Sequence, residues 1–448
     1  MITAERNTGR AHVIGAGLAG LAASVELAAR GYPVVLYESS QQAGGRCRSY
    51  FDSELGCRID NGNHLLLSGN VSALAYVDLI GARDTFQPPG AAAIPFVDLA
   101  DNARWTVRPA AGRIPWWLFA ADRRVPGARL RDYLRALKLW RATPEDTVAG
   151  LLDARDVLYR RLWEPLAVAA LNTAAADGAA RLLARIVAET LGRGAAACRP
   201  MLPRDGLSES FVDPALRFLR QHGGDIRFGA RLRSLDFADR RLTSLDFDGD
   251  RVTVHPDDTV ILAVPASIAG RLVPGLMVPD DYAPIVNAHY RYDLPADAPR
   301  LTGIVGGTAE WVFAKPGIAS VTVSAADAIV DQPAAELRDA LWPDVAMVLS
   351  LPPLPVPLAR IVKERRATFR ATSAQEARRP VAATQWNNLH LAGDYTATGL
   401  PATIEGAIRS GVAAAFHVHQ GRTPQAASST ATVTRSTAHF RDCLRTLS

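Results

Sequence analysis

The chain has 448 residues, of which 48% are hydrophobic, so it can bury a large core in more than one domain. Its 50 basic residues against 45 acidic ones give a net charge of +5, too mild an imbalance for a nucleic-acid-binding protein and better suited to an anionic membrane surface. The four cysteines have no metal-ligand spacing and no apolar run approaches the ~18 residues of a membrane-spanning helix, so we expect no metal site and a cytoplasmic protein in a reducing compartment.

Residues 12–46 begin with the pattern of a strand, a glycine turn and a helix that together bind a dinucleotide. The apolar strand ends at the sequence GAGLAG, after which small and apolar residues recur at helical spacing. Gly15 permits the tight turn, Gly17 lets the backbone approach a pyrophosphate, and Gly20 lets the helix lie close on the sheet. The N-terminus of the helix then faces the phosphates, whose oxygens need backbone N–H donors.

A second strand at 33–37 ends at Glu38, which stands 18 positions after the last glycine of the first turn. A carboxylate there accepts hydrogen bonds from ribose hydroxyls and repels a 2′-phosphate, which argues against NADP in this site. A second glycine turn follows, and Gly45 and Arg46 add backbone donors and a guanidinium that suits phosphate. The alternative is a structural βαβ unit with incidental glycines, and it leaves the spaced acid and the second turn unexplained.

The segment 59–64, IDNGNH, leads from polar residues into an apolar run. Its glycine allows close approach of the backbone, and Asp60 and His64 are the first candidates for acid–base catalysis. A histidine that is merely satisfied by backbone hydrogen bonds is an equally weighted interpretation of His64.

A Pro- and Trp-rich stretch from residue 86 marks the beginning of a second domain. Residues 129–141 predict a basic amphipathic helix with Leu130, Tyr133, Leu134, Leu137 and Trp140 on one face. Such a helix could lie on an anionic bilayer, which would make the protein peripheral on the inner face of the cell membrane. The alternative, a lid or core helix with a solvated basic face, carries somewhat more weight. Further helices are predicted up to about residue 191.

The α/β pattern returns near residue 206. It predicts a helix at 211–221, strands at 225–228 and 231–237, a hairpin turned at Asp248–Gly249, and a buried strand at 259–264. Residues 270–385 then have short strand-like runs and a helix near 331–341, and we expect them to complete the second domain.

The last folded segment is a strand that ends at Gly393–Asp394, followed by a loop and a helix that opens at residue 402. Asp394 at the strand end could hold a ribityl hydroxyl or a phosphate-bound water. The positive end of the helix, at Thr403, could stabilise negative charge at N1 and O2 of a reduced isoalloxazine. Residues 421–448 are rich in Ser, Thr, Ala and Arg, which predicts a flexible tail.

These elements predict an α/β fold with a discontinuous, Rossmann-like FAD-binding domain and an α+β substrate-binding domain. We assign residues 1–85, 205–270 and 386–420 to the FAD-binding domain, and residues 86–204 and 271–385 to the substrate domain.

The two ends of the chain together resemble the FAD-dependent amine oxidase and carotenoid desaturase superfamily, and more narrowly the hydroxysqualene dehydroxylases. The resemblance is carried by the segments 13–46, 59–64, 114–117, 171–173, 210–220, 263–265 and 392–411. The DNGxH segment of the family often has Gln where this chain has Asn63.

The resemblance implies that FAD is bound by Gly15, Gly17, Gly20, Glu38, Gly45, Arg46, Gly393 and Asp394. It also implies that the backbone at Leu232 meets the adenine, and that the second domain covers the flavin with an apolar tunnel to which Trp116–Trp117 contributes a wall.

The activity that the resemblance implies is replacement of the central hydroxyl of hydroxysqualene by hydrogen. That alcohol is allylic, so an acid that helps the hydroxyl leave as water would produce a delocalised cation, which a hydride from N5 of reduced flavin can quench. We expect His64 to donate the proton or to orient the water that does, with Asp60 holding its tautomer and the helix at Thr403 supporting the flavin anion. The sequence does not identify the electron donor, which is either NADPH or a partner.

Two rival functions follow from the same fold. A polyene desaturase or an amine oxidase would reverse the electron flow, and an amine oxidase would need an aromatic cage, for which only Tyr395 is close to the C-terminal flavin motif. A lipid carrier that had lost its cofactor would not need the intact glycines or Glu38.

Overall fold

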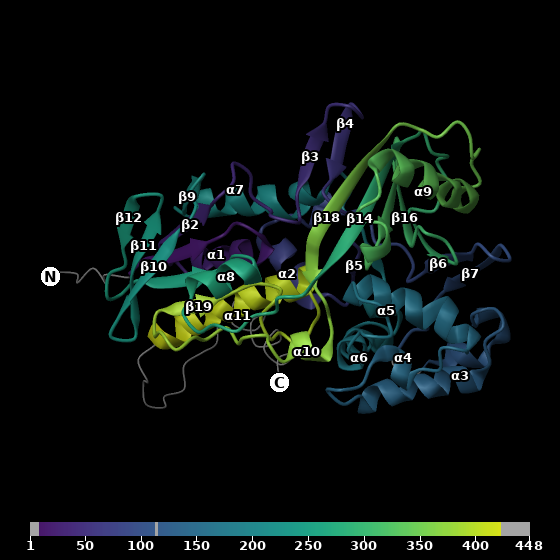
Figure 1. Ribbon diagram of the computed structural model, residues 1–448, viewed down its shortest axis with the longest axis horizontal. Helices are drawn as coiled ribbons and strands as arrows, with labels where there is room; N and C mark the ends of the chain where they lie inside the picture. The colour runs from purple at the N-terminus through teal and green to yellow at the C-terminus, as the bar shows by residue number, and fades with distance from the viewer. Residues whose placement is uncertain (1–8, 113–114, 423–448) are drawn as a thin grey trace.

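The computed structural model describes residues 9–112 and 115–422. The predicted tail beyond residue 422 and Ile114 of the Trp-rich segment lie outside the described residues. Two sheets with their helices lie side by side, one on the left of Figure 1 and the other on its right, and the long strands β14 and β18 form the edge of the right sheet that lies nearest the left half.

The left sheet is parallel and has the strand order β19-β13-β1-β2-β9. Its strands are β1 (Ala11–Ile14), β2 (Val34–Glu38), β9 (Asp225–Phe228), β13 (Thr259–Leu262) and β19 (Leu389–Leu391). The central strands β1 and β13 are buried along their whole length, as expected for a parallel sheet that is covered on both faces. This sheet confirms the predicted α/β class with a Rossmann-like part.

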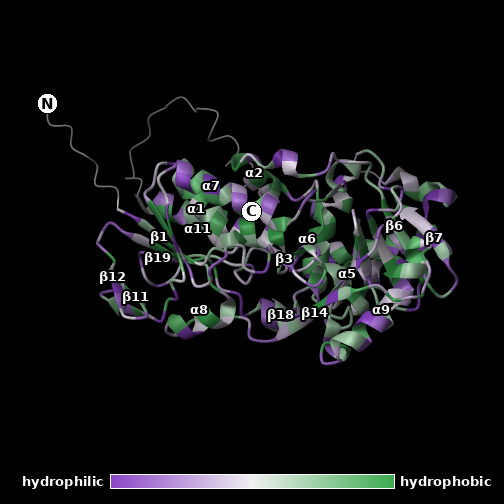
Figure 2. Cartoon of the chain, turned by 90° about the horizontal axis from the view of Figure 1, so that it is seen from above, coloured by the Kyte–Doolittle hydropathy of each residue, from purple (hydrophilic) through white to green (hydrophobic). Residues whose placement is uncertain are grey.

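Helices cover one face of this sheet, and a hairpin with a short helix covers the other. The first layer is α1 (Leu18–Ala29), α2 (Val71–Leu79), α7 (Asp213–Gln221) and α11 (Ile404–Arg422). The second is β10 (Ser234–Ala238), β11 (Arg241–Phe247), β12 (Asp250–Thr253) and α8 (Ala266–Leu272). α1 and α11 pack so closely that a Cβ on Gly411 would lie 2.1 Å from the carbonyl oxygen of Ala19. Figure 2 shows hydrophobic residues along α1, α11 and β1, and hydrophilic ones on β11 and β12.

The right sheet has seven strands in the order β18-β14-β17-β16-β15-β6-β7, antiparallel except for the pair β15–β6. They are β6 (Ile94–Asp98), β7 (Ala103–Val107), β14 (Tyr282–Arg291), β15 (Leu301–Val305), β16 (Trp311–Lys315), β17 (Ile318–Val323) and β18 (Ala359–Phe369). Helix α9 (Ala334–Leu349) packs on it in one core. The other core contains the helical cluster α3 (Leu130–Arg135), α4 (Val148–Leu151), α5 (Glu164–Leu171) and α6 (Ala180–Glu189).

The remaining elements are short and connect the two halves. They are the pairs β3 (Ser49–Asp52) with β4 (Cys57–Asp60) and β5 (Leu66–Leu67) with β8 (Pro200–Met201), and the helix α10 (Ser373–Glu376). Single turns of 3-10 helix occur at Arg83–Thr85, Trp116–Phe119, Ala121–Arg123, Ala136–Arg141, Leu191–Arg193, Ala195–Ala197 and Ala326–Ala328, and π turns at Tyr159–Trp163 and Ser208–Val212.

A buried network of charges fastens α11 to α2 and α6. The Glu405 carboxylate accepts the N–H groups of Ser72 (3.0 Å) and Ala73 (2.8 Å) at the start of α2. Arg409 pairs with Glu405 at 2.9 Å and with Glu189 of α6 at 2.8 Å. Because every charge in this network has an opposite partner, removal of one member would leave a buried charge unpaired. Such a change typically lowers the free energy of unfolding by ~3–5 kcal/mol.

The predicted basic helix at 129–141 is wrong as a single α-helix, because α3 ends at Arg135 and a 3-10 segment continues to Arg141. Its apolar residues do not share one environment. Tyr133 and Leu139 are buried and Leu130 is half-buried, whereas three others are exposed, namely Leu134 (55%), Leu137 (59%) and Trp140 (53%). The helical cluster therefore presents apolar side chains to its surroundings.

Three other boundaries differ from those predicted. The strand expected at 231–237 begins at Ser234, because Ala230 still bonds to the end of β2 through the carbonyl of Glu38. α9 runs from Ala334 to Leu349 rather than near 331–341. α11 begins at Ile404 because Thr403 caps it, and it continues to Arg422, so the predicted tail does not begin at 421. No helix within residues 9–112 and 115–422 combines the length and apolar character needed to cross a membrane.

Candidate active site

The first glycine turn lies between β1 and α1, and two of its glycines are required by the fold itself. Gly15 has φ +104°, and a Cβ there would lie 2.4 Å from the carbonyl oxygen of Ala263. A Cβ on Gly20 would lie 1.9 Å from the carbonyl oxygen of Gly15. Neither position can accept a side chain without moving the backbone.

Gly17 is different, because its backbone has the ordinary values φ −72° and ψ 174° and a Cβ there would meet no atom within 4 Å. It is the N-cap of α1 and makes no side-chain cap bond, so the first N–H groups of α1 have no side-chain acceptor. Helix N–H groups beside open space fit the pyrophosphate of a dinucleotide.

The second glycine turn lies against the first. The N–H of Gly44 donates to the carbonyl of Ala16 at 2.8 Å, and a Cβ on Gly45 would lie 3.5 Å from the Cα of Gly17. Gly45 has φ +57°, a conformation that favours glycine. The two predicted phosphate turns therefore form one surface.

Glu38 is fixed at the end of β2 beside these turns. One carboxylate oxygen accepts the N–H of Ala16 at 2.8 Å, and the other accepts the N–H of Ser40 at 2.9 Å. The oxygen that accepts the Ala16 N–H keeps a lone pair for a ribose hydroxyl, whereas the other oxygen also accepts the Ser39 hydroxyl at 3.2 Å. Leu232 lies two residues beyond Ala230 and its main chain makes no hydrogen bond to another described residue, which leaves it able to meet an adenine.

Arg46 and Asp394, which come from opposite ends of the chain, form an ion pair at 2.7 Å. The Asp394 carboxylate raises the pKa of Arg46. The Arg46 side chain is 45% exposed, and it also donates to the carbonyl of Ala367. The strand end before Asp394 is held by a bond from the Gly393 N–H to Ser410 Oγ at 2.8 Å. Two residues that were predicted separately thus contact each other.

The loop that leads into α11 is shaped by Arg379, which the sequence analysis did not single out. Its guanidinium is buried and donates to the main-chain carbonyls of Leu400 (2.7 Å), Asp394 (3.1 Å) and Thr396. It also pairs with the Glu376 carboxylate at 2.6 Å. No motif or spacing marks this arginine, since most of its partners are main-chain atoms 15 to 21 residues away.

Thr403 closes the loop at the start of α11. Its hydroxyl accepts the N–H of Gly406 at 3.0 Å, while the N–H groups of Thr403 and Ile404 have no acceptor among the described residues. The positive end of α11 is therefore available to negative charge, as the sequence predicted. The glycine turns, Glu38, Leu232 and this helix end fit a flavin dinucleotide.

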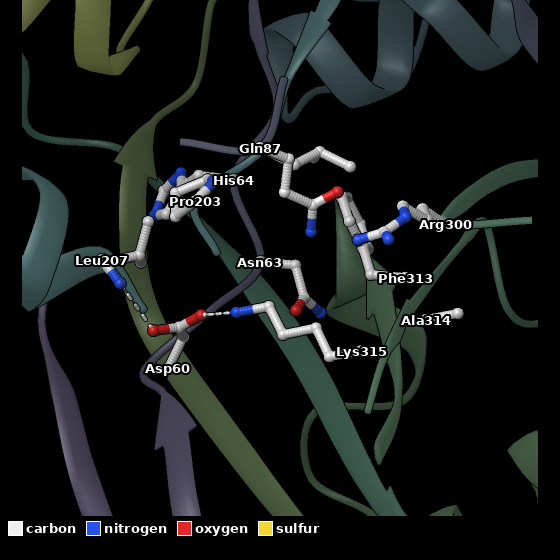
Figure 3. Close-up of a pocket in the computed structure, with 11 residues that line it drawn as sticks. Asp60, Asn63, His64, Gln87, Pro203, Leu207, Arg300, Phe313, Ala314 and Lys315 are labelled. Carbon is white, nitrogen blue, oxygen red and sulfur yellow. Dashed lines mark hydrogen bonds and ion pairs between the residues drawn. The ribbon is translucent and has the colours of Figure 1, made fainter. Parts of the chain in front are cut away.

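A small pocket opens beside the segment 59–64, with a cavity volume of about 20 Å³, which is room for about one water molecule. It is lined by Asp60, Asn63, His64, Gln87, Leu202, Pro203, Leu207, Arg300, Phe313, Ala314 and Lys315. Figure 3 shows Lys315 extending across the pocket towards Asp60, with Arg300 and Gln87 on the opposite side from Asp60. One polar chamber thus receives side chains from the end of β4, from loops and from β16 of the right sheet.

Asp60 does not bond to His64, and the predicted role of Asp60 in holding the His64 tautomer is wrong. Its carboxylate accepts the Ser49 hydroxyl (2.6 Å), the Leu207 N–H (2.9 Å) and the Lys315 ammonium (2.5 Å). Sequence reasoning missed Lys315 because it lies 255 residues from Asp60 and in no motif.

The surroundings of Asp60 and His64 in the pocket determine whether each side chain is charged at neutral pH. Burial raises the pKa of Asp60, but the contacts with Lys315, Ser49 and Leu207 outweigh it and hold the pKa below its ordinary value. Burial lowers the pKa of His64 to about 4, and the nearby Arg46 charge acts in the same direction. At neutral pH Asp60 is therefore ionised and His64 is neutral.

The segment 59–64 is docked on the right sheet by its asparagine. Asn63 Nδ2 donates to Thr322 Oγ1 at 3.1 Å, and Thr322 donates to Asn287 Oδ1 at 2.9 Å. Asn287 and Thr322 face each other on β14 and β17. Trp117 of the Trp-rich segment does not line this pocket, and its ring packs edge-on against Tyr133 in the helical cluster, with centroids 5.6 Å apart.

Residues 18–419 match the family of flavin containing amine oxidoreductases. The chain is 48% identical to a hydroxysqualene dehydroxylase of Rhodopseudomonas palustris over 405 residues, which cover 90% of this chain and 97% of that one. It is 47% identical to the same enzyme of Sinorhizobium fredii over 408 residues, with the same coverage of both chains.

The chain belongs to the flavin-containing amine oxidoreductase family. The cofactor of this family fits the site described above, so the protein is an FAD-dependent oxidoreductase. Among solved structures, cyclohexylamine oxidase of Brevibacterium oxydans has the same fold, with a TM-score of 0.63 at 15% identity over 92% of this chain and 99% of that one.

The contrast between Gly17 and Gly20 gives a direct test of the cofactor site. In Gly17→Val the fold has room for the side chain but the phosphates do not, so we expect an unchanged melting temperature of the flavin-free protein and a loss of roughly 3 kcal/mol, or about 100-fold, in FAD affinity. Flavin absorbance after titration measures this.

Two matched variants control the test. Gly20→Val should fail to fold because its Cβ overlaps the backbone, and Gly90→Val, at a site that is equally open, should keep full FAD affinity. Normal FAD binding by Gly17→Val would contradict the assignment of the phosphate site.

Proposed function

We propose that the protein removes the central hydroxyl of hydroxysqualene by reduction and releases squalene, as its relatives are named to do. The observation that carries the proposal is the polar pocket, in which Asp60, His64 and Lys315 converge and His64 is close enough to Arg46 for the guanidinium to lower its pKa. When bound, reduced FAD supplies the hydride that replaces the hydroxyl.

The residues of the chain supply the remaining requirements of the reaction. The polar chamber offers hydrogen bonds to the hydroxyl that leaves, and its apolar lining by Leu202, Pro203 and Phe313 suits the adjoining isoprenoid carbons. His64, which is neutral, takes the second of its two predicted roles and orients a water or the hydroxyl rather than supplying the proton. Negative charge on the reduced flavin is stabilised by the N-terminus of α11.

The pocket is less suited to an amine oxidase. Lys315 and Arg300 are two cations against the single carboxylate of Asp60, so a protonated amine would meet net repulsion. A polyene desaturase is not disfavoured in this way and stands as the second candidate. A lipid carrier without cofactor is disfavoured by the intact dinucleotide surface.

The reaction needs a two-electron donor, for which we propose NADPH or a redox partner. Glu38 would repel the 2′-phosphate of NADPH, so the reductant acts on the bound flavin from outside the dinucleotide site.

We also infer that the helical cluster docks on an anionic membrane from the inner face of the cell. Leu134, Leu137 and Trp140 are more than half exposed, and they alternate along the chain with basic residues that are also exposed, namely Arg131, Lys138 and Arg141. Apolar side chains with a cationic surround match the interface of an anionic bilayer, in which an isoprenoid substrate would dissolve.

The reaction is tested by anaerobic incubation of the reduced holoprotein with hydroxysqualene, phytoene or simple amines, followed by product analysis. We expect squalene from hydroxysqualene, in an amount equal to the flavin oxidised, and no turnover of the other two. Desaturation of phytoene by the oxidised enzyme, with no squalene formed, would replace the proposal by the second candidate. A purified protein without flavin absorbance would contradict both.

Membrane docking is tested by sedimentation with vesicles of phosphatidylglycerol or phosphatidylcholine. We expect binding to the anionic vesicles that weakens with salt, and a loss of about tenfold or more when Leu134, Leu137 and Trp140 are all changed to Ser. The matched control is Met277→Ser, which removes an apolar side chain of similar exposure (56%) near α8. Equal binding by the triple variant and the wild type would contradict the proposal.

A further inference from the structure

The pocket contains four ionisable side chains, and they differ in whether they can give up a proton at neutral pH. Asp60 is ionised and His64 is neutral, so neither holds a proton that an acid catalyst would transfer. The Arg300 guanidinium stays charged in proteins and does not release its protons. Only the ammonium of Lys315 combines a positive charge with a proton that can leave.

The composition of the chain makes a lysine at this position notable. Only three of its 50 basic residues are lysines, at positions 138, 315 and 363, and all the others are arginines. An arginine would also satisfy a carboxylate and often does so better, through two parallel bonds. A pure ion-pair role for position 315 therefore does not explain why this basic residue is a lysine.

The geometry keeps the ammonium in place and leaves it accessible. Lys315 Nζ donates to Asp60 Oδ2 at 2.5 Å, and Asp60 is itself held by Ser49 and Leu207. The Lys315 side chain is 26% exposed, and it lines the same pocket as His64 and Asn63. One bond to Asp60 leaves two N–H donors for a group that enters the pocket.

We propose that Lys315 is the acid that protonates the departing hydroxyl group of the substrate alcohol. This inference rests on the proposed function. The bond between carbon and oxygen breaks with its electron pair going to oxygen, oxygen takes a proton from Lys315 Nζ, and water leaves. When bound, reduced FAD would supply the hydride that the allylic carbon accepts, so that the alcohol would be reduced by two electrons and the flavin oxidised. The neutral amine regains its proton from solvent through the open side of the pocket.

A change of Lys315 to arginine tests whether the residue acts as an acid or only as a partner in an ion pair. Lys315→Arg keeps the charge beside Asp60 but removes the transferable proton. We expect it to keep FAD absorbance, substrate affinity and melting temperature, while the single-turnover rate of squalene formation falls by about 10²–10⁴. The matched control, Lys363→Arg on β18, makes the same exchange outside the pocket and should keep the wild-type rate.

Rescue by small cations supplies a second readout. Added ammonium or methylammonium should restore part of the lost rate to Lys315→Ala, whereas tetramethylammonium, which carries charge but no proton on nitrogen, should not. If Lys315→Ala fails to fold because Asp60 is left unpaired, Lys315→Ala combined with Asp60→Asn provides the same test.

The outcomes distinguish this inference from the proposed function. Failure of the wild-type holoprotein to form squalene would overturn the function. Formation of squalene by the wild type and at an equal rate by Lys315→Arg would overturn only the role of Lys315, as would equal rescue by tetramethylammonium.

Discussion

The buried carboxylate of Asp60 is the interaction on which the arrangement of the site depends. It ends β4, and its three partners come from β3, from the turn before α7 and from β16 of the seven-stranded sheet. A buried acid is stable as an anion only when each oxygen is hydrogen-bonded and a positive charge is near. Ser49 and Leu207 donate to Oδ1, and Lys315 donates to Oδ2 and supplies the charge. Asp60 and Lys315 therefore hold the β3–β4 pair on the seven-stranded sheet, and the pocket lies at that contact.

A second ion pair joins the distant parts of the cofactor site. The surface for the phosphates is formed by the first 46 residues, whereas the helix end for the flavin ring is formed some 350 residues later. Arg46 and Asp394 join these parts directly, and Arg379 fixes the loop between them through main-chain carbonyls. The cofactor site and the pocket are thus both assembled by contacts between distant segments of the chain.

Local patterns predicted the parts of the structure whose causes are local. Three such parts are the glycine turn, Glu38 at the end of β2 and the capped start of α11. Each depends on neighbours within a few residues or on one βαβ unit, so its spacing can be recognised in the sequence. Lys315, Arg379 and Asn287 could not be found in this way, because their partners lie far along the chain. The same limit explains why Asp60 was wrongly predicted to hold the tautomer of His64. The two residues are close in sequence, but the Asp60 carboxylate bonds to other residues.

We propose that the protein reduces the carbon that carries the hydroxyl, with a hydride that reduced FAD would supply. The most direct measurement is a single turnover of hydroxysqualene with flavin reduced so that N5 carries deuterium. The account predicts squalene with one deuterium at the former hydroxyl carbon or its allylic equivalent. Unlabelled squalene formed at the rate of flavin oxidation would contradict it.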